Sequence, residues 1–288
     1  MKMPDKTIKA VITYVRSELN EYYPASELNS MLYIMLDKFF DVSKKEVLIG
    51  NEKRLSESEL LKIIYAVKDL KKHQPLAYIF GEWDFYGLLF IVNEHTLIPR
   101  PETEELVQLI IKENKLSNPT MLDIGTGSGC IAISLKKNIP NSKVFAYDVS
   151  KEALAVAEQN ANKNNVEVNF NEVDILNDKE NLTFRFDVIV SNPPYIPVKD
   201  KDSMDKNVLE YEPHLALFVE NEQPLTFYNA IAEFAKKHLT NNGKLYFEIH
   251  EKLGDEVKNL LKIKGFTNVE IVDDMNGKNR MVKCCYVL

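Results

Sequence analysis

The chain has 288 residues, of which 45% are hydrophobic and 27% are charged, fractions that are ordinary for a globular protein and exclude disorder along the whole chain. Its 36 basic and 43 acidic residues give a formal net charge of −7. That acidic balance argues against a protein that coats nucleic acid through its charge.

The first 75 residues are predicted to form a small helical bundle. Apolar residues recur there at spacings of three and four, which places them on one face of a helix. Ser56 and Glu59 have the spacing of a capping box at a helix N-terminus, and an apolar run follows them at once. The apolar positions that define three helical stretches are Ile8, Val11, Ile12 and Val15, then Leu28, Leu32, Met35 and Phe39, and then Leu60, Leu61, Ile64 and Val67.

Residues 76–100 are predicted to form a β-hairpin and a linker. Two runs of aromatic and β-branched residues, 78–83 and 88–92, lie on either side of a short turn-forming segment. Pro99 and Pro101 each disfavour helix at the residue before them, as expected of a linker. We therefore expect a third part to begin at residue 101.

Residues 101–288 are predicted to form an α/β domain, because strands and helices alternate along them. This alternation is typical of a mostly parallel sheet with helices on both faces. The last two predicted strands have only a short connection, so we expect an antiparallel pair at the end of the sheet. The predicted helices are 103–114, one that starts near 128, 150–164, 225–239 and 251–263, and the seven predicted strands are 121–124, 143–149, 168–175, 186–191, 244–250, 269–272 and 281–288.

A glycine-rich loop joins the first strand of this sheet to the helix that follows. Gly125, Gly127 and Gly129 permit a tight turn and a close approach of a ligand to the backbone. The helix N-terminus behind the loop favours polar or anionic groups. The spacing differs from the dinucleotide-binding fingerprint, whose third glycine falls where Cys130 stands, and it favours S-adenosylmethionine over NAD.

Acidic residues stand at the ends of the first three predicted strands. Asp123 stands two residues before the glycine loop at the end of the first strand, and Asp148 ends the second strand, where an acid hydrogen-bonds ribose hydroxyls in both classes of cofactor. Asp174 ends the third strand, from which it is placed to face an adenine ring. The loop and these acids together predict an adenosine-type cofactor.

The segment Ser191-Asn192-Pro193-Pro194-Tyr195 follows the fourth predicted strand. Its two prolines stiffen the backbone and remove two N–H donors, which leaves the Asn192 side-chain oxygen and the Pro193 carbonyl as hydrogen-bond acceptors. Tyr195 adds a flat apolar face with a polar tip. Such a site suits a planar –NH2 group, because two acceptors hold its hydrogens while the aromatic face covers its π system.

An amide or exocyclic amine is a poor nucleophile, because its lone pair is delocalised. Acceptors on both N–H bonds would orient the nitrogen and favour loss of a proton as the bond to carbon forms. The fourth strand ends beside the first in the predicted sheet, so the amine would face the methyl donor. We expect the rate to come from alignment in a water-poor pocket, with neither a metal nor a covalent protein nucleophile.

Together these motifs resemble the amino-methyltransferases, which act on adenine, guanine or glutamine nitrogen. Three further segments, 99–104, 209–217 and 274–280, are similar to signatures of the HemK/PrmC family, the protein-(glutamine-N5) methyltransferases that act on peptide chain release factors. The resemblance covers nearly the whole chain. It implies a Rossmann-like S-adenosylmethionine-dependent methyltransferase sheet whose last strand is antiparallel, with a small N-terminal helical domain and a linking β-hairpin.

The resemblance also implies the reaction. A methyl group would pass from S-adenosylmethionine to the side-chain amide nitrogen of the glutamine in the Gly-Gly-Gln motif of class I release factors, which the helical domain would help to grip. The chain departs from the family's usual residues at Ile175, at Glu222 and at His250, to which we assign no function. The residues that match the family's cofactor site are Gly125, Thr126, Gly127, Ser128, Gly129, Asp148, Asp174 and Asn192, and those that match its glutamine-holding motif are Asn192, Pro193, Pro194 and Tyr195.

Two alternative substrates stay open: a glutamine of a ribosomal protein, and adenine or guanine of DNA or RNA. The acidic charge and the lack of a long basic segment argue against direct contact with nucleic acid. The five histidines and three cysteines show no zinc-ligand spacing, so no metal is expected. With no disulfide framework, no apolar stretch long enough to span a membrane and no secretory signal, we expect a cytoplasmic protein. We also expect it to be a monomer.

Overall fold

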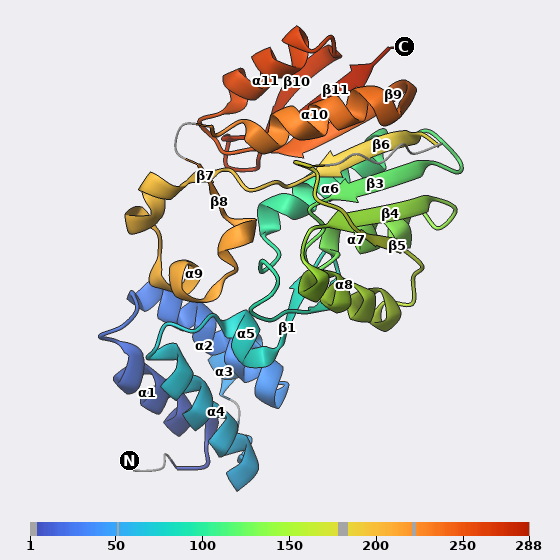
Figure 1. Cartoon of the computed structure of the whole chain (residues 1–288). Coiled ribbons are helices and arrows are strands. Elements are labelled where there is room, and N and C mark those ends of the chain that lie inside the picture. Colours follow the sequence, from blue (N-terminus) through green and yellow to red (C-terminus); the bar gives the residue numbers. More distant parts are fainter. Residues whose placement is uncertain (1–4, 51, 178–183, 221–222, 288) are drawn as a thin grey trace. The chain divides into compact units, whose positions relative to one another are not determined.

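A computed structural model describes residues 5–50, 52–177, 184–220 and 223–287 (Figure 1). The chain divides into two compact units, Met1–Phe80 and Gly81–Leu288. Each unit buries apolar side chains of its own. Among the helices that the structure describes, none has the length and apolar composition needed to cross a membrane.

Helices account for nearly all of the regular structure in the first unit. Their buried faces meet in an apolar core that includes Val11, Leu32, Leu36 and Ile63. The predicted helical bundle therefore has the core that its apolar spacing requires. The helices are α1 (Ile8–Leu19), α2 (Ala25–Phe40), α3 (Lys44–Ile49), α4 (Glu57–Leu70) and α5 (Leu76–Phe80).

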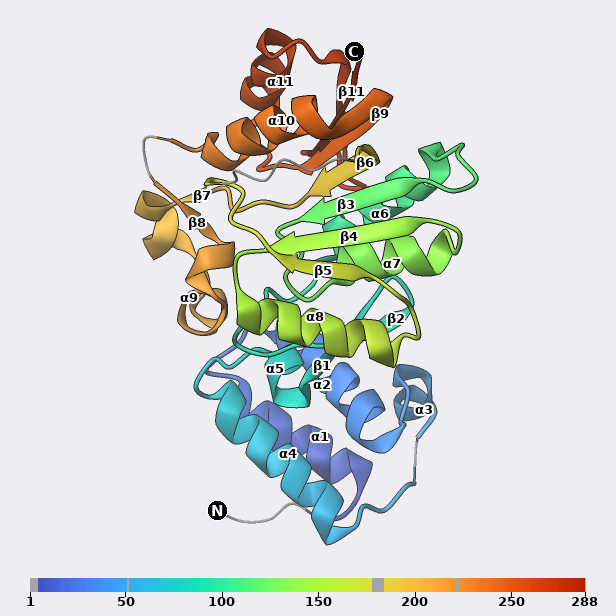
Figure 2. The same cartoon turned by 45° about the vertical axis from the view of Figure 1, so that its right-hand side comes forward.

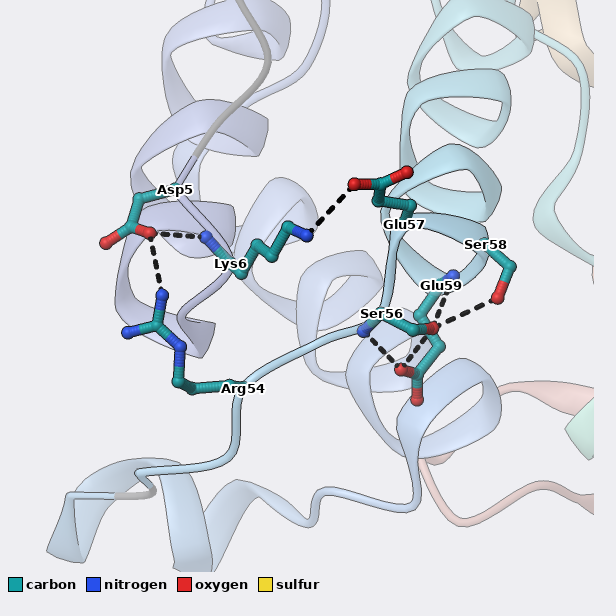
Figure 3. Close-up of polar contacts among 7 residues, drawn as sticks. All are labelled: Asp5, Lys6, Arg54, Ser56, Glu57, Ser58 and Glu59. Carbon is teal, nitrogen blue, oxygen red and sulfur yellow. Dashed lines mark hydrogen bonds and ion pairs between the residues drawn. The ribbon is translucent and has the colours of Figure 1, made fainter.

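The N-terminus of α4 has the predicted capping box. The Ser56 hydroxyl accepts a hydrogen bond from the Glu59 backbone N–H at 3.2 Å, and the Glu59 carboxylate accepts one from the Ser56 backbone N–H at 2.8 Å (Figure 3). Beside it, exposed ion pairs join Lys6 to Glu57 at 3.1 Å and Arg54 to Asp5 at 3.5 Å. Because exposed ion pairs add little to stability, the capping box is the more important contact here.

The predicted first strand of the hairpin is wrong at its beginning. Residues 78–80 belong to helix α5, and strand β1 (Glu82–Phe85) begins only after Gly81, before pairing with β2 (Leu88–Ile91). The backbone N–H groups of Tyr78 and Ile79 both donate to the Pro75 carbonyl, at 3.0 and 3.1 Å, which closes the first turn of the helix. Burial of Leu76 and Ala77 outweighs the strand preference of the aromatic residues.

The second unit is built around a seven-stranded sheet with the order β10-β11-β9-β6-β3-β4-β5. Strands β5, β4, β3, β6 and β9 pair in parallel, whereas β11 is antiparallel to both β9 and β10. The predicted fold class is confirmed, and β3 lies between β6 and β4 (Figure 2). The strands are β3 (Thr120–Ile124), β4 (Lys143–Asp148), β5 (Asn169–Glu172), β6 (Phe186–Ser191), β9 (Leu239–Glu248), β10 (Thr267–Asp273) and β11 (Asn279–Tyr286).

Successive side chains of each strand point to opposite faces of this sheet, and each face carries a core of its own. Leu122 and Phe145 pack with residues of α10 and α11. Their neighbours Met121 and Val144 pack with residues of α6, α7 and α8. The helices are α6 (Pro101–Glu113), α7 (Cys130–Asn138) and α8 (Lys151–Lys163) on one face, and α10 (Thr226–His238) and α11 (Gly254–Ile263) on the other.

The predicted boundaries differ most at β9, which begins at Leu239 rather than at residue 244. Leu239 pairs with Phe186, but Lys244 pairs with Val188, so β9 carries extra residues opposite β6. The Thr240 hydroxyl donates to the Asp187 carboxylate at 3.0 Å and holds this irregular stretch in place. A polar, glycine-containing segment was predicted as a loop because its pairing partner is distant in the sequence.

Between β6 and α10 the chain leaves the sheet and forms a separate segment, 196–219, beyond the carboxyl ends of the parallel strands (Figures 1 and 2). Two short strands, β7 (Ile196–Pro197) and β8 (Phe218–Val219), pair in parallel and join its ends. Between them lie the 3-10 helix Val198–Ser203, helix α9 (Lys206–Tyr211) and the 3-10 helix His214–Ala216.

Gly129 lies where α7 begins, close to α8. Its φ is +80°, and a Cβ placed there would lie 2.8 Å from Cδ1 of Ile133 and 3.1 Å from Cβ of Ala157. The Ile133 side chain can turn away, but the Ala157 methyl group is fixed to the backbone of α8. Glycine therefore serves the packing of the two helices as well as the backbone conformation.

Gly129→Ala is expected to lower the free energy of unfolding by about 1–3 kcal/mol through overpacking, beyond the cost of its left-handed backbone. Gly265→Ala is the matched control, because Gly265 has a φ of +90° and open space at its Cβ position. Urea denaturation of both variants and the parent chain gives the comparison. Equal losses in the two variants would contradict the packing argument.

Candidate active site

The glycine loop and the Asn-Pro-Pro-Tyr segment meet because β3 and β6 are neighbours. These strands pair in parallel up to Ile124 and Ser191, and the Ser191 hydroxyl donates to the Ile124 carbonyl at 2.7 Å. The two segments that follow therefore leave the sheet side by side, at the edge where ligands bind in open α/β sheets. Both line one cavity, as the predicted strand order required.

The glycine loop is tied to the end of β4. The backbone N–H groups of Gly125 and Thr126 both donate to the Tyr147 carbonyl, at 2.8 and 3.0 Å. The Gly127 N–H donates to Oδ2 of Asp148 at 2.8 Å. A Cβ at Gly127 would meet no protein atom within 4 Å, and Gly127 lines the cavity, so the glycine leaves room for a ligand to approach the backbone.

Asp148 and Asp174 both lie on the wall of this cavity. Oδ1 of Asp148 accepts the Ser150 N–H at 3.0 Å, and burial raises the pKa of the Asp148 carboxyl. Asp174 accepts hydrogen bonds from the Leu176 N–H at 2.9 Å and from Nδ2 of Asn177 at 2.7 Å. Each carboxylate is thus held in a defined orientation beside the cavity.

Three other residues of the predicted cofactor set differ in position. Thr126 and Ser128 are buried and line the cavity. The Thr126 hydroxyl donates to Oδ2 of Asp123 at 2.6 Å, and burial raises the pKa of Asp123 to about 7. Gly129 is absent from the cavity wall within the described residues, because it faces Ile133 and Ala157 instead.

Only some of the predicted acceptor residues line the cavity. Asn192, Pro193 and Pro194 line the cavity, whereas Tyr195 is not part of its wall in the described chain. The Tyr195 ring instead meets the His250 ring edge-on, with centroids 5.8 Å apart. Burial raises the pKa of Tyr195 to about 12, so its hydroxyl stays protonated near neutral pH. His250, to which the sequence assigned no function, therefore supports the Asn-Pro-Pro-Tyr segment.

A buried polar network that joins Asn192 to Thr103, also on the cavity wall, and to Glu248 was not predicted. The Thr103 hydroxyl donates to Oε2 of Glu248 at 2.6 Å, and Nδ2 of Asn192 donates to the Thr103 hydroxyl at 3.3 Å. Thr103 lies in the first turn of α6, and Glu248 is the last residue of β9. Thr103 occurs within the 99–104 signature, but nothing in the local sequence indicates its partners.

The segment 209–217 supplies a buried acid that binds the linker. Oε1 of Glu212 pairs with the Arg100 guanidinium at 2.5 Å, and Oε2 accepts the Ile98 N–H at 3.1 Å. The Glu212 side chain is 1% exposed. This contact holds Pro213 and Leu215, which line the cavity, against the segment that precedes the sheet.

The segment 274–280 forms a tight turn around Asp274. Oδ1 of Asp274 accepts the backbone N–H groups of Asn276 and Lys278 at 2.9 and 3.0 Å, and Oδ2 accepts Nε of Arg280 at 3.2 Å. These bonds, led by the one from Lys278, lower the pKa of Asp274. The positive charge of Arg280 favours the ionised forms of Tyr195 and Glu248, so the turn places a cation behind the site.

The cavity has the groups that S-adenosylmethionine requires. Its wall joins the backbone of the glycine loop, the fixed carboxylate of Asp148 and the apolar side chains of Val149 and Ile175. Close backbone approach, an acceptor for ribose hydroxyls and apolar surface for an adenine ring are thus combined. Within the described ranges, no group of three or more His, Cys, Asp or Glu side chains is placed to hold a metal. Glu222 and Leu288 lie outside the described residues.

Comparison with known proteins decides the family. Residues 102–211 match the methyltransferase small domain. A release factor glutamine methyltransferase of Flavobacterium psychrophilum is 49% identical over 280 residues, which cover 96% of this chain and 98% of the relative. The chain belongs to the release factor glutamine methyltransferase family.

Other similarities agree with this assignment. The family member from Bacteroides thetaiotaomicron is 40% identical over 272 residues, covering 94% of this chain and 98% of the relative. A crystal structure of a methyltransferase from Pyrococcus furiosus superimposes with a TM-score of 0.52 at 20% identity, covering 81% of this chain and 100% of that one. That structural likeness concerns the fold. The resemblance drawn from the glycine loop and the three signatures is confirmed at the level of the family.

Proposed function

We propose that this chain transfers a methyl group from S-adenosylmethionine to N5 of the glutamine in the Gly-Gly-Gln motif of class I peptide chain release factors. The observation that carries the proposal is the cavity in which Asn192 and Pro193 meet the glycine loop. Family membership supports the substrate class, because relatives over nearly the whole chain are named for release factor glutamine methylation. The proposal places the reaction in the cytoplasm, on a monomeric enzyme.

The chain's own residues would act by holding and orienting the acceptor. S-adenosylmethionine, when bound, supplies an electrophilic methyl group. The Asn192 side-chain oxygen and the Pro193 carbonyl would accept hydrogen bonds from the two N–H groups of the glutamine amide and so fix the position of its nitrogen. Gly127 leaves room beside the loop, and Asp148 would bind ribose hydroxyls.

Proton loss follows from the same arrangement. As the nitrogen forms its bond to carbon, it would become more acidic and lose one proton to solvent water, because the carbonyl oxygens of Asn192 and Pro193 orient the N–H groups but are too weakly basic to keep the proton. Pro193 is buried, which limits the water that competes with its carbonyl for the glutamine N–H groups. Alignment and preorganised acceptors are therefore the sources of rate acceleration in this site.

Labelled S-adenosylmethionine tests the proposal. We would offer the enzyme a purified class I release factor, the same factor with its Gly-Gly-Gln glutamine replaced by alanine, ribosomal protein, and bulk DNA and RNA. We expect label on the intact factor alone, at that one glutamine by mass spectrometry. Label on nucleic acid or ribosomal protein, with none on the factor, would overturn the proposal.

A further inference from the structure

We propose that Thr103 is a positioning residue that fixes which edge of the Asn192 amide faces the cavity, and that Glu248 sets the direction of its hydroxyl. The inference rests on the proposed function, in which the Asn192 oxygen holds the acceptor amide. It concerns Thr103, which lines the cavity beside Asn192, and Glu248, which is outside the cavity wall in the described chain, rather than the groups that hold the glutamine amide.

A threonine hydroxyl has a single proton to donate. Thr103 uses that proton in its 2.6 Å bond to Oε2 of Glu248, which is 2% exposed. Towards Asn192, the hydroxyl can then only accept a hydrogen bond. At the observed 3.3 Å, Asn192 must therefore present its NH2 group to Thr103.

The planarity of the amide carries this constraint to the cavity. When Nδ2 of Asn192 faces Thr103, Oδ1 lies on the other edge of the amide group, and Asn192 lines the cavity. An asparagine without such a partner could rotate by half a turn and offer its NH2 group to the substrate. In that orientation the NH2 group of Asn192 would face the NH2 group of the glutamine. Both groups are donors, so no hydrogen bond would form between them.

Protonation of Glu248 would reverse the direction of the network. A neutral carboxyl can donate to the Thr103 hydroxyl, which is then able to donate to Oδ1 of Asn192 and favour the unproductive orientation. Burial raises the pKa of Glu248 to about 7. The charged and titratable groups that act on or contact Glu248 are Arg280 of β11, Arg100 and Glu102 at the start of α6, Tyr195, Tyr228 of α10 and Cys130 of α7.

Thr103→Val tests the inference, because it keeps the shape of the side chain and removes the hydroxyl. We expect kcat for methyl transfer to fall by about tenfold, as for the loss of one hydrogen bond, with the Kd for S-adenosylmethionine unchanged. Thr103→Ser should restore most of the activity. Thr267→Val, at an exposed position on β10, is the matched control and should behave as the parent chain.

The pH profile provides a readout that a merely structural function would not change. In the parent enzyme we expect kcat to fall as the pH is lowered through about 7, as Glu248 gains a proton. Glu248→Gln and Thr103→Val should both lose this part of the acid limb. Any contribution of Asp123, whose pKa burial also raises to about 7, would persist in both variants.

The measurements distinguish failure of the proposed function from failure of the inference about Thr103. A parent chain that does not methylate the release factor contradicts the proposed function. An active parent chain, together with a Thr103→Val variant that keeps both the parent kcat and the parent pH profile, overturns this inference alone. Equal losses in Thr103→Ser and Thr103→Val, with unchanged thermal unfolding, would also overturn it, because the hydroxyl would then not be the group that matters.

Discussion

Asn192→Ala is expected to lower kcat for methyl transfer by about 10²–10³-fold, the loss seen when one preorganised hydrogen-bonding group is removed from a reacting centre. The variant should still bind S-adenosylmethionine, because the glycine loop and Asp148 remain. Labelled methyl transfer to the release factor measures the first effect. Calorimetric titration with S-adenosylhomocysteine measures the second.

The control for this variant is Asn162→Ala, which removes an asparagine side chain from the exposed face of α8. It should match the parent chain in both measurements. Full activity in Asn192→Ala would contradict the mechanism, since the amide would then be held by other groups. Loss of cofactor binding would instead assign Asn192 chiefly to the cofactor site.

Asp148→Ala is expected to weaken binding of S-adenosylmethionine by about 10–100-fold, as for the loss of a charge-assisted hydrogen bond. The variant loses the predicted contact with the ribose. It also leaves the N–H groups of Gly127 and Ser150 without the carboxylate that orients them. The Kd from calorimetric titration with S-adenosylhomocysteine is the measurement.

Asp255→Ala removes an exposed acid from the start of α11 and serves as the control for charge. It should leave the Kd unchanged. An unchanged Kd in Asp148→Ala would show that this carboxylate orients the loop without binding the cofactor.

Much of the second unit could be predicted because its elements have strong local signals. Strand β4 contains Val144 and Phe145, whose side chains enter the two different cores, so the strand is apolar on both faces. Ser150 caps α8 by accepting the Ala153 N–H at 3.1 Å, as its position before the helix predicted. Helix α5 was missed because burial outweighed the strand preference of its aromatic residues.

The site was predictable only where its residues are adjacent in the chain. The glycine loop and Asn192–Tyr195 are continuous motifs, and both were found. Thr103 and Glu248 are 145 positions apart, so no local spacing connects them. The motifs identified Tyr195 and Gly129 but did not show that these residues face away from the cavity. Their positions depend on packing against His250 and Ala157.

The contacts of Glu212 limit which substitutions members of this family can tolerate. One buried carboxylate binds both the Arg100 side chain and the Ile98 backbone, so two segments more than a hundred positions apart share a single contact. Removing Arg100 alone would leave the buried carboxylate of Glu212 without its cation, which is strongly destabilising, whereas the Arg100 side chain is 35% exposed and can be hydrated when Glu212 is lost. Substitutions in the two segments should therefore be correlated among homologues, with loss of the arginine accompanied by loss of the acid.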